Sequence, residues 1–148
     1  MFKHVLIPID GSALSIKAVQ SGVAFAKAMG AKLTVLTIIE PTGVLATDSK
    51  RVAATRQAYE QHVREIAERE LKDAERAAKK QGVPCTTVLQ QHSQPYQAII
   101  ETAKKKRCDL IAMASHGRRG VSALLLGSET NKVLTHSRIP VLVYRFAT

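Results

Sequence analysis

Small residues in the last third of the sequence have the spacing of a phosphate-binding loop. Gly117 and Gly120 have no side chain, so backbone N–H groups beside them can approach an anion closely. Gly127 and Ser128 precede a segment with helical periodicity, where a helix N-terminus would add unpaired N–H groups, the positive end of the helix dipole and a hydroxyl. An arginine pair between the first two glycines adds positive charge. These residues predict a site for a phosphate group or a polyphosphate.

Polar segments also end two earlier apolar runs. Residues 10–12 follow the run 4–9, and residues 38–43 end the β-branched run 32–39. Ligands of doubly wound sheets bind beyond the carboxyl ends of the strands, so both segments are candidates for the same site. The chain has neither G-x-G-x-x-G after the first run nor G-x-x-x-x-G-K-[ST] anywhere. The missing fingerprints disfavour NAD-type dehydrogenases and P-loop NTPases.

Two alternating hydrophobic periods predict the elements that position these segments. Short apolar runs indicate buried strands, and apolar residues recurring every three or four positions indicate helices. The strands are predicted at 4–9, 32–39, 83–89, 109–114 and 139–144, and the helices at 12–29, about 48–81, 95–107 and from near 128. In the long helix, Val52, Tyr59, Val63 and Ile66 lie on one apolar stripe. The pattern predicts an α/β fold, a doubly wound five-stranded parallel sheet sandwiched by helices.

The length and composition fit one globular domain, residues 1–148. With 148 residues there is little room for two separate cores, and 45% hydrophobic and 23% charged residues are ordinary globular values. The apolar runs are far shorter than the roughly 20 residues that cross a bilayer. Asp10 follows the first run directly, which is unlike a secretory leader. We therefore expect a soluble cytoplasmic protein without a membrane partner.

The charge is strongly basic and unevenly distributed along the chain. The formal net charge is +10, and residues 104–148 hold nine Lys or Arg against two Asp or Glu. This excess favours an anionic ligand near the C-terminal third. Cys85 and Cys108 are too few for a disulfide framework and are predicted to be free core thiols. The histidines show no i, i+4 pairing, so no protein-built metal site is expected, and a divalent ion would arrive on a triphosphate.

In their order along the chain, these motifs resemble the universal stress protein family over essentially the whole length. The resemblance is carried by the segments Val5–Ser12, Ser115–Gly120, Leu124–Ser128 and Pro140–Val143. ATP-binding members of the family carry G-x2-G-x9-G-[ST] where this chain has Ala114-x2-Gly117-x9-Gly127-Ser128. The resemblance implies a Rossmann-like fold of the adenine nucleotide alpha hydrolase type, ATP as ligand with or without Mg²⁺, and a homodimer formed through the last strand. The long apolar edge of that strand would favour such pairing.

The resemblance also implies roles for individual residues. Gly117, Gly127 and Ser128 would cradle ribose and phosphates, Asp10 would hold polar atoms of ribose or adenine, and the backbone of Ile38 would pair with the adenine edge. The whole predicted binding set is Pro8, Asp10, Ile38, Met113, Ala114, His116, Gly117, Arg118, Gly120, Gly127, Ser128, Glu129 and Thr130. Ala114 replaces the first glycine of the motif. Its methyl group would cost on the order of 1 kcal/mol if the site needs a positive φ there, and less if it needs only closeness.

Three functions remain open at this level. The first is an adenine-nucleotide-binding stress-response module that acts on an unknown protein partner, and the second is an interaction module of the same fold without nucleotide. The third is slow ATP hydrolysis; with no paired carboxylates beside the loop, no catalytic residue is assigned. A nucleic-acid partner is not expected, since three Phe, three Tyr and no Trp make a poor base-stacking platform despite the charge.

Overall fold

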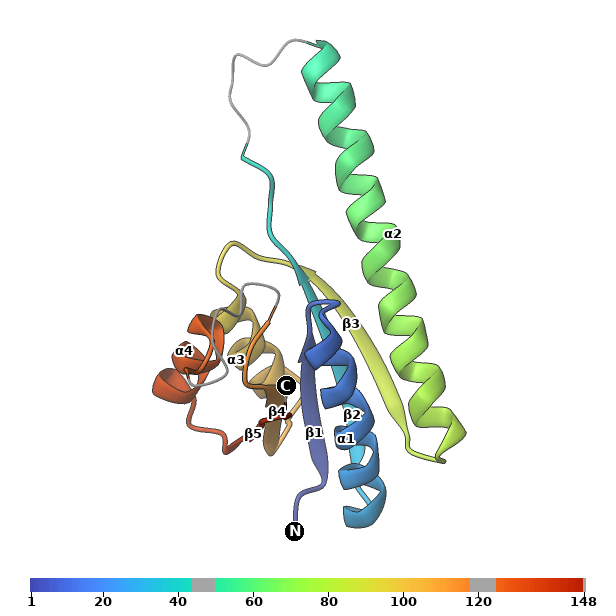
Figure 1. Cartoon of the computed structure of the whole chain (residues 1–148), viewed down its shortest axis with the longest axis vertical. Coiled ribbons are helices and arrows are strands. Elements are labelled where there is room, and N and C mark those ends of the chain that lie inside the picture. The colour runs from blue at the N-terminus through green and yellow to red at the C-terminus, as the bar shows by residue number, and fades with distance from the viewer. Residues whose placement is uncertain (44–49, 118–124, 148) are drawn as a thin grey trace.

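The computed structural model describes residues 1–43, 50–117 and 125–147, and their strands form one five-stranded parallel sheet (Figure 1). The elements in chain order are β1 His4–Ile9, α1 Ala13–Met29, β2 Lys32–Ile39, α2 Lys50–Lys80, β3 Cys85–Gln91, α3 Pro95–Lys105, β4 Leu110–Ala114, α4 Ser128–His136 and β5 Val141–Tyr144. The predicted α/β architecture and all nine predicted elements are confirmed, with ends that differ by a few residues.

The strand order places a topological switch beside the first strand. The order is β3-β2-β1-β4-β5, so the chain moves outward from β1 to β3 and then returns to the other side of β1 for β4 and β5. Every neighbouring pair is parallel, from His4–Lys32 in β1 and β2 to Ala114–Tyr144 in β4 and β5. All five carboxyl ends therefore meet at one edge of the sheet. In such folds the crevice between β1 and β4 at this edge is where ligands bind.

Helices cover both faces of the sheet (Figure 1). On one face, α1 and the C-terminal half of α2 pack on a buried cluster that includes Val5, Ile7 and Val35. On the other, α3 and α4 pack on a cluster that includes Leu6 and Ile111. Because β1 contributes alternate residues to both clusters, its side chains are buried on both sides.

Three helices end in the same left-handed conformation at the amino edge of the sheet. Gly30 after α1 has φ 62° and Gly82 after α2 has φ 72°, which glycine adopts without steric cost. After α3 the corresponding residue is Arg107, at φ 57°. In the described ranges, Arg107 is the single non-glycine residue with a positive φ. The predicted start and stop of α1 are also confirmed, since the Ser12 hydroxyl accepts a hydrogen bond from the Ser15 N–H at 3.2 Å.

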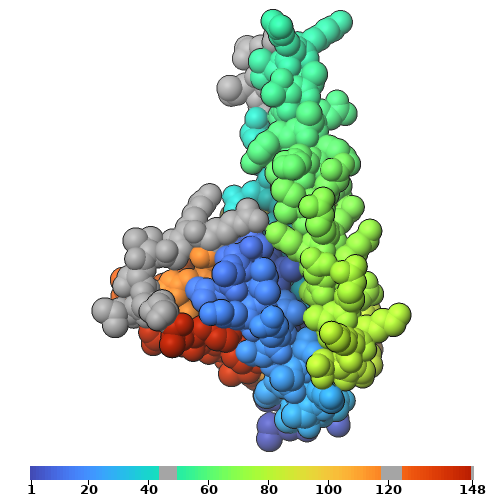
Figure 2. Space-filling model, turned by 45° about the vertical axis from the view of Figure 1, so that its right-hand side comes forward, coloured from blue at the N-terminus to red at the C-terminus, as the bar shows by residue number. Residues whose placement is uncertain are grey.

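The first half of α2 extends beyond the sheet (Figures 1 and 2). Its 31 residues span about 46 Å, whereas the longest strand, with eight residues, spans about 27 Å. The buried residues of α2 accordingly begin at Ala67. The apolar stripe predicted from the sequence is thus uncovered at its start, where Val52 is 51% exposed and Tyr59 is 58% exposed. The predicted helix start near residue 48 lies outside the described residues.

Polar contacts, one of them fully buried, join the amino-terminal parts of β1 and its neighbours. The Asp109 carboxylate accepts the backbone N–H groups of Lys3 at 2.8 Å and His4 at 2.9 Å. The buried His4 ring pairs with the Thr34 hydroxyl at 2.8 Å, which in turn contacts Thr86 at 3.0 Å. Burial, followed by the charge of Lys32, lowers the pKa of His4, so the folded protein holds this ring neutral.

The two cysteines differ in their burial. Cys108 lies in the core at 6% exposure, as predicted, and Cys85 is only half-buried because β3 is an edge strand. Both are free thiols, and burial raises the pKa of each to about 11. Neither is therefore a thiolate at neutral pH. Among the helices of the described residues, none combines the length and the hydrophobicity of a membrane-spanning segment.

Candidate functional site

The carboxyl edge of the sheet brings together the first and third polar segments predicted from the sequence. Asp10 follows β1 and Gly117 follows β4, and the two touch: a Cβ atom on Gly117 would overlap Oδ2 of Asp10. Asp10 is positioned by its own turn, in which Gly11 has φ 77° and the Ser12 N–H donates to Oδ1 of Asp10 at 3.0 Å. Gly117 itself has no positive φ, so close approach is the reason for a glycine there.

Gly127 brings the start of α4 against the same loop. Its N–H donates to the Ser115 carbonyl at 2.8 Å. A Cβ on Gly127 would lie 3.2 Å from that carbonyl oxygen and 3.3 Å from Cα of His116, tighter than most real contacts. The residue before α4 therefore crosses directly over residues 115–117, and a larger side chain would push the helix away from the loop.

The N-terminus of α4 lacks the caps found on two neighbouring helices. Ser12 caps α1 with its hydroxyl. In the first turn of α3, the Tyr96 N–H has a partner from α4, because it donates to the Glu129 carboxylate at 2.9 Å. No side chain of the described residues caps α4, which begins at Ser128 after Gly127. Its first-turn N–H groups and the positive end of its dipole are thus available to an anion beside the Asp10–Gly117 contact.

Buried polar atoms without a partner mark the same edge. Among the described residues there are three such side-chain atoms: Oγ1 of Thr37, Nε2 of His116 and the hydroxyl of Tyr144. Thr37 is near the end of β2 opposite Ile9, and Tyr144 ends β5. The His116 ring is oriented by a 2.9 Å contact between Nδ1 and the Ser115 hydroxyl. Buried polar groups are rarely left unpaired, so three at one edge indicate space for a polar ligand.

Thr37 and Tyr144 are absent from the predicted binding set. Both lie near the carboxyl ends of their strands, where a polar side chain among apolar neighbours is the available sequence signal. That signal is weak, because strand residues alternate between two faces and the sequence does not say which neighbours they meet. Burial also raises the pKa of Tyr144, which keeps its hydroxyl a neutral donor.

Ala114 is accommodated without backbone strain. It is the last residue of β4, pairs with Tyr144 and has no positive φ. Its carbonyl accepts the Thr130 hydroxyl at 3.1 Å, and it is 7% exposed. The cost expected for a methyl group at a left-handed position therefore does not arise here. Replacing the first motif glycine leaves the backbone of this loop in an ordinary strand conformation.

Other predicted residues have structural roles or lie at the margin of the site. Thr130, at 2% exposure, ties α4 to β4, and Met113 is a core residue at 6% exposure. Pro8 is part of β1. The backbone of Ile38 pairs with Gln90 of β3. The pairing of β2 with β1 ends one residue earlier, at Thr37, so Ile38 has no partner residue in β1.

Two predicted residues, Arg118 and Gly120, lie outside the described residues. The basic residues of the C-terminal third do not all gather at this site, contrary to the expectation from the sequence. Of the nine basic residues in 104–148, five lie at the amino edge, remote from this site: Lys104, Lys105, Lys106, Arg107 and Arg138. Their charge cannot be assigned to the carboxyl-edge ligand.

The residues present fit a nucleotide better than a metal held by side chains. In the described parts of the chain, no group of three or more His, Cys, Asp or Glu side chains could hold a metal ion. A phosphate chain needs close backbone approach and free N–H groups, and Gly117, Gly127 and the start of α4 offer both. The unpaired atoms of Thr37, His116 and Tyr144 offer polar contacts nearby.

Sequence comparisons place the chain among known relatives. The model of the universal stress protein family matches residues 1–145. The chain is 30% identical over 149 residues to universal stress protein YxiE of Bacillus subtilis, covering 98% of this chain and 100% of the relative. It is 32% identical over 145 residues to a universal stress protein of Thermus aquaticus, again covering 98% and 100% of the two chains.

Solved structures show the same fold. Protein MJ0577 of Methanocaldococcus jannaschii superposes with a TM-score of 0.82 at 24% identity, covering 100% of this chain and 99% of the other. A universal stress protein in complex with cAMP gives 0.69 at 24% identity, covering 99% and 98% of the two chains. The protein from Archaeoglobus fulgidus in complex with dAMP gives 0.65 at 16%, covering 97% of each.

Proposed function

Because this chain belongs to the universal stress protein family, we propose that its carboxyl-edge site binds an adenine nucleotide, with ATP as the expected ligand. One observation carries the proposal: the three buried side-chain polar atoms without partners in the described residues all lie where β2, β4 and β5 end. Structural neighbours determined with cAMP and dAMP support the ligand class. The domain would be residues 1–148, acting in the cytoplasm as a stress-response module.

Each part of the site would contact a different part of the nucleotide. The N–H groups of α4, with Gly127 and Ser128, would hold phosphates. Asp10 would accept hydrogen bonds from ribose or adenine, and Ile38 would offer backbone atoms to the adenine edge. Since Gly117 fits directly against Asp10, the loop after β4 and the turn after β1 are placed as a unit. Mg²⁺, if present, would be held mainly by the phosphates.

The residues favour binding over turnover. Hydrolysis needs a positioned base beside the reacting phosphate. Glu129 is engaged by the Tyr96 N–H and by Lys132, whose Nζ lies 3.2 Å from its carboxylate, and Asp10 is engaged by the Ser12 N–H. We therefore assign no catalytic residue and propose that the bound nucleotide changes how the protein associates with a partner.

Calorimetric titration of the purified protein tests this function. At about 100 µM protein, we expect saturable heat with ATP and Mg²⁺. Comparing the dissociation constants of ATP, AMP and cAMP then identifies the preferred ligand. A silent titration with all three nucleotides, by protein shown to be free of bound nucleotide by mass spectrometry, would contradict the proposal. It would favour the nucleotide-free interaction module, particularly if Ala114→Gly then created binding.

We also propose that two copies pair through β5. This strand is at one edge of the sheet, with β4 on one side. The carbonyls of Pro140 and Tyr144 accept hydrogen bonds from the N–H groups of Ile111 in β4 and of Ser115 directly after it. Backbone groups of successive strand residues point to opposite sides, so the N–H and C=O of Val141 and Val143 point to the open edge. Such an edge is a template for a second strand.

Val143→Pro should weaken this dimer by about 30-fold. Proline removes the outward N–H of Val143 in each copy, and two lost hydrogen bonds at about 1 kcal/mol each give that factor. The ladder to β4 uses the alternate residues and would remain. Sedimentation equilibrium of Val143→Pro against Val143→Thr, which keeps the N–H, measures the effect. Equal dissociation constants for the two variants would place the dimer contact elsewhere.

A further inference from the structure

Nearly all of the net charge of this protein lies at the amino edge of the sheet, opposite the candidate nucleotide site. We define the amino edge as residues 1–3, 27–32, 79–84, 104–109 and 137–140, which begin the strands and end the helices. These segments hold ten Lys or Arg and a single acid, Asp109. The remainder of the chain holds 12 Lys or Arg against 11 Asp or Glu. Of the +10 net charge, +9 therefore belongs to one surface.

Hydrogen bonds show that these segments are neighbours in space. Lys32 N–H donates to the Lys3 carbonyl at 3.0 Å, and Lys3 N–H donates to Asp109 at 2.8 Å. On the outer strands, Leu33 N–H donates to Pro84 at 2.8 Å, and Ile111 N–H donates to Pro140 at 3.0 Å. The five segments thus form a continuous row across the sheet, about 19 Å wide at a strand spacing of about 4.8 Å.

The cations of this row are exposed, and one of them, Lys27, donates to the Gln81 side chain at 3.2 Å. The ten side chains, all of them exposed, are Lys3, Lys27, Lys32, Lys79, Lys80, Lys104, Lys105, Lys106, Arg107 and Arg138. Within the described parts of the chain, none of them forms a salt bridge. One turn back along α2, Lys72, Asp73, Glu75 and Arg76 carry balanced charge, so the excess is confined to the row.

Helix dipoles explain only part of this accumulation. Cations suit helix C-termini, which accounts for lysines such as Lys27 and Lys80. Lys3 and Arg138, however, precede strands, and Lys32 is the first residue of β2. Arg107 has a left-handed backbone where α1 and α2 end in glycine, at a cost of about 1 kcal/mol. A cation kept at a strained position indicates that its charge has a use beyond local structure.

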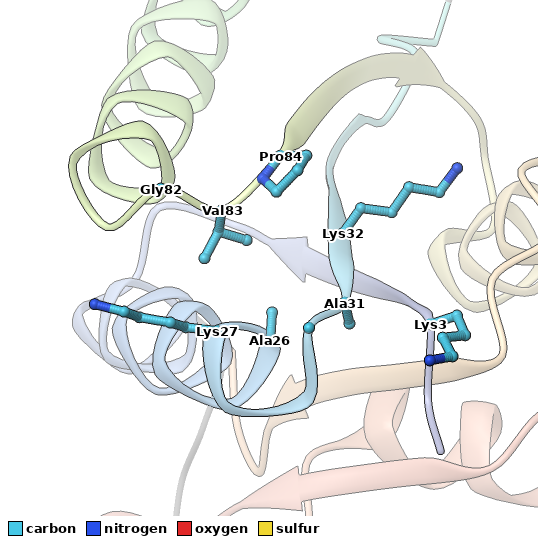
Figure 3. A pocket seen from close by; sticks show the side chains of 9 residues that line it. Lys3, Ala26, Lys27, Ala31, Lys32, Gly82, Val83 and Pro84 are labelled. Carbon is cyan, nitrogen blue, oxygen red and sulfur yellow. The ribbon is translucent and has the colours of Figure 1, made fainter.

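The arrangement favours an extended polyanion over a small anion. Gly82, Val83 and Pro84 line a hollow of about 300 Å³ at this edge, together with the stems of three lysines. Figure 3 shows that Lys27 and Lys32 extend to opposite sides of this hollow, so their ammonium groups do not converge on one point. Charges spread along a row match a chain of phosphates instead.

We propose that the amino edge binds the phosphate backbone of double-stranded nucleic acid without reading its sequence. Duplex DNA carries one negative charge per about 1.7 Å, so roughly ten phosphates lie along a row of this width. The aromatic residue of the row, Phe2, packs on Phe25 with ring centroids 6.3 Å apart and is not a stacking platform for single strands. The exposed large apolar residue of the row is Met1, and a single such side chain is too small an apolar surface for insertion into a membrane.

A nucleic-acid partner, which was not expected from the sequence, is compatible with the few aromatic residues of the chain. The shortage of aromatic residues argues against base stacking, and it says nothing against phosphate contact, which needs only cations at the correct spacing. The proposal is independent of nucleotide binding, because the two sites are at opposite ends of the strands.

Fluorescence anisotropy with a labelled 20-base-pair duplex of mixed sequence, from 50 to 200 mM KCl, tests the proposal. We expect log K to fall linearly with log salt. The variant Lys105→Gln/Arg107→Gly removes two cations and should reduce the slope by about 1.8 and the affinity at 100 mM salt by more than about tenfold. It should unfold at an unchanged or higher temperature, because glycine suits the positive φ of Arg107.

The matched control is Arg64→Gln/Arg69→Gln, which removes the same charge from exposed positions of α2 outside the row. It should keep the salt slope of the parent protein. Absence of duplex binding at 50 mM KCl, equal losses in the two variants, or tighter binding of a single strand would each overturn the proposal. Binding to vesicles with about 30% phosphatidylserine but not to the duplex would also overturn it and indicate a membrane surface.

Discussion

Gly117→Val is expected to weaken ATP binding by at least about 100-fold. A Cβ at this position overlaps Oδ2 of Asp10, and valine adds two further carbons. Either the loop after β4 or the Asp10 carboxylate must move, and Asp10 also holds the Ser12 N–H. Loss of two hydrogen bonds involving charged groups, at about 1.5 kcal/mol each, corresponds to this factor.

Isothermal titration with ATP and Mg²⁺ measures the effect, and Gly117→Ala should give an intermediate loss. Ala28→Val is the matched control, because it adds branched carbons at an exposed position of α1. Urea unfolding of each variant shows whether the fold is intact. Wild-type affinity in a folded Gly117→Val protein would mean that ATP does not use this loop.

Asp109→Ala is expected to destabilise the fold by about 2–4 kcal/mol. Its carboxylate accepts two backbone N–H groups, from Lys3 and His4, and its own N–H donates to the His4 carbonyl at 2.9 Å. Hydrogen bonds to a charged group contribute about 1.5–3 kcal/mol each, and this site is partly exposed, so the lower end applies. The substitution removes the two side-chain hydrogen bonds that join the starts of β1 and β4, while the backbone N–H of residue 109 still donates to His4.

The matched control is Asp73→Ala, which removes the same charge from an exposed pair with Arg76 on α2 and should cost less than about 1 kcal/mol. Free energies of unfolding from urea titrations of both variants decide the comparison. Similar losses would show that the negative charge of Asp109, and not its hydrogen bonds to Lys3 and His4, stabilises the amino edge.

The same groups predict how stability depends on pH. Burial alone would raise the pKa of Asp109, but hydrogen bonds from the His4 and Lys3 N–H groups outweigh it and hold the pKa below its ordinary 3.8. Its contribution is therefore present above that pH and is lost as the pH falls through the lowered value. For His4 the pKa is lowered by burial, so stability declines as the pH falls below 6.5, where the unfolded chain gains a proton.

Unfolding free energies measured between pH 3 and 8 should show both declines in the wild type. Asp109→Asn should lack the decline in stability below pH 3.8 and keep the decline below pH 6.5 that His4 causes. A variant that retained the full decline below pH 4 would show that other carboxylates, and not Asp109, govern acid unfolding.

Local sequence patterns were sufficient to predict the helices and strands and the fold class. Residues close together in the sequence are enough to define the apolar runs of β1 and β2 and the periodicity of α1. The same holds for Ser12 and Gly30, which cap the two ends of α1. Such local signals survive in any tertiary context. The family motif likewise located Gly117 and Gly127 without reference to the fold.

Contacts between distant residues, in contrast, depend on how the strands and helices pack together. Asp10 and Gly117 are over a hundred positions apart and touch because β1 and β4 pair at the switch point. The parallel pairing of the strands brought Thr37 and Tyr144 to the same edge of the sheet. The backbone conformation showed that Ala114 is not strained. Five parallel strands with antiparallel helices also gathered the scattered lysines at the opposite edge and left the first half of α2 uncovered. Register and crossover direction create these contacts, and neither is encoded in the pattern of any single segment.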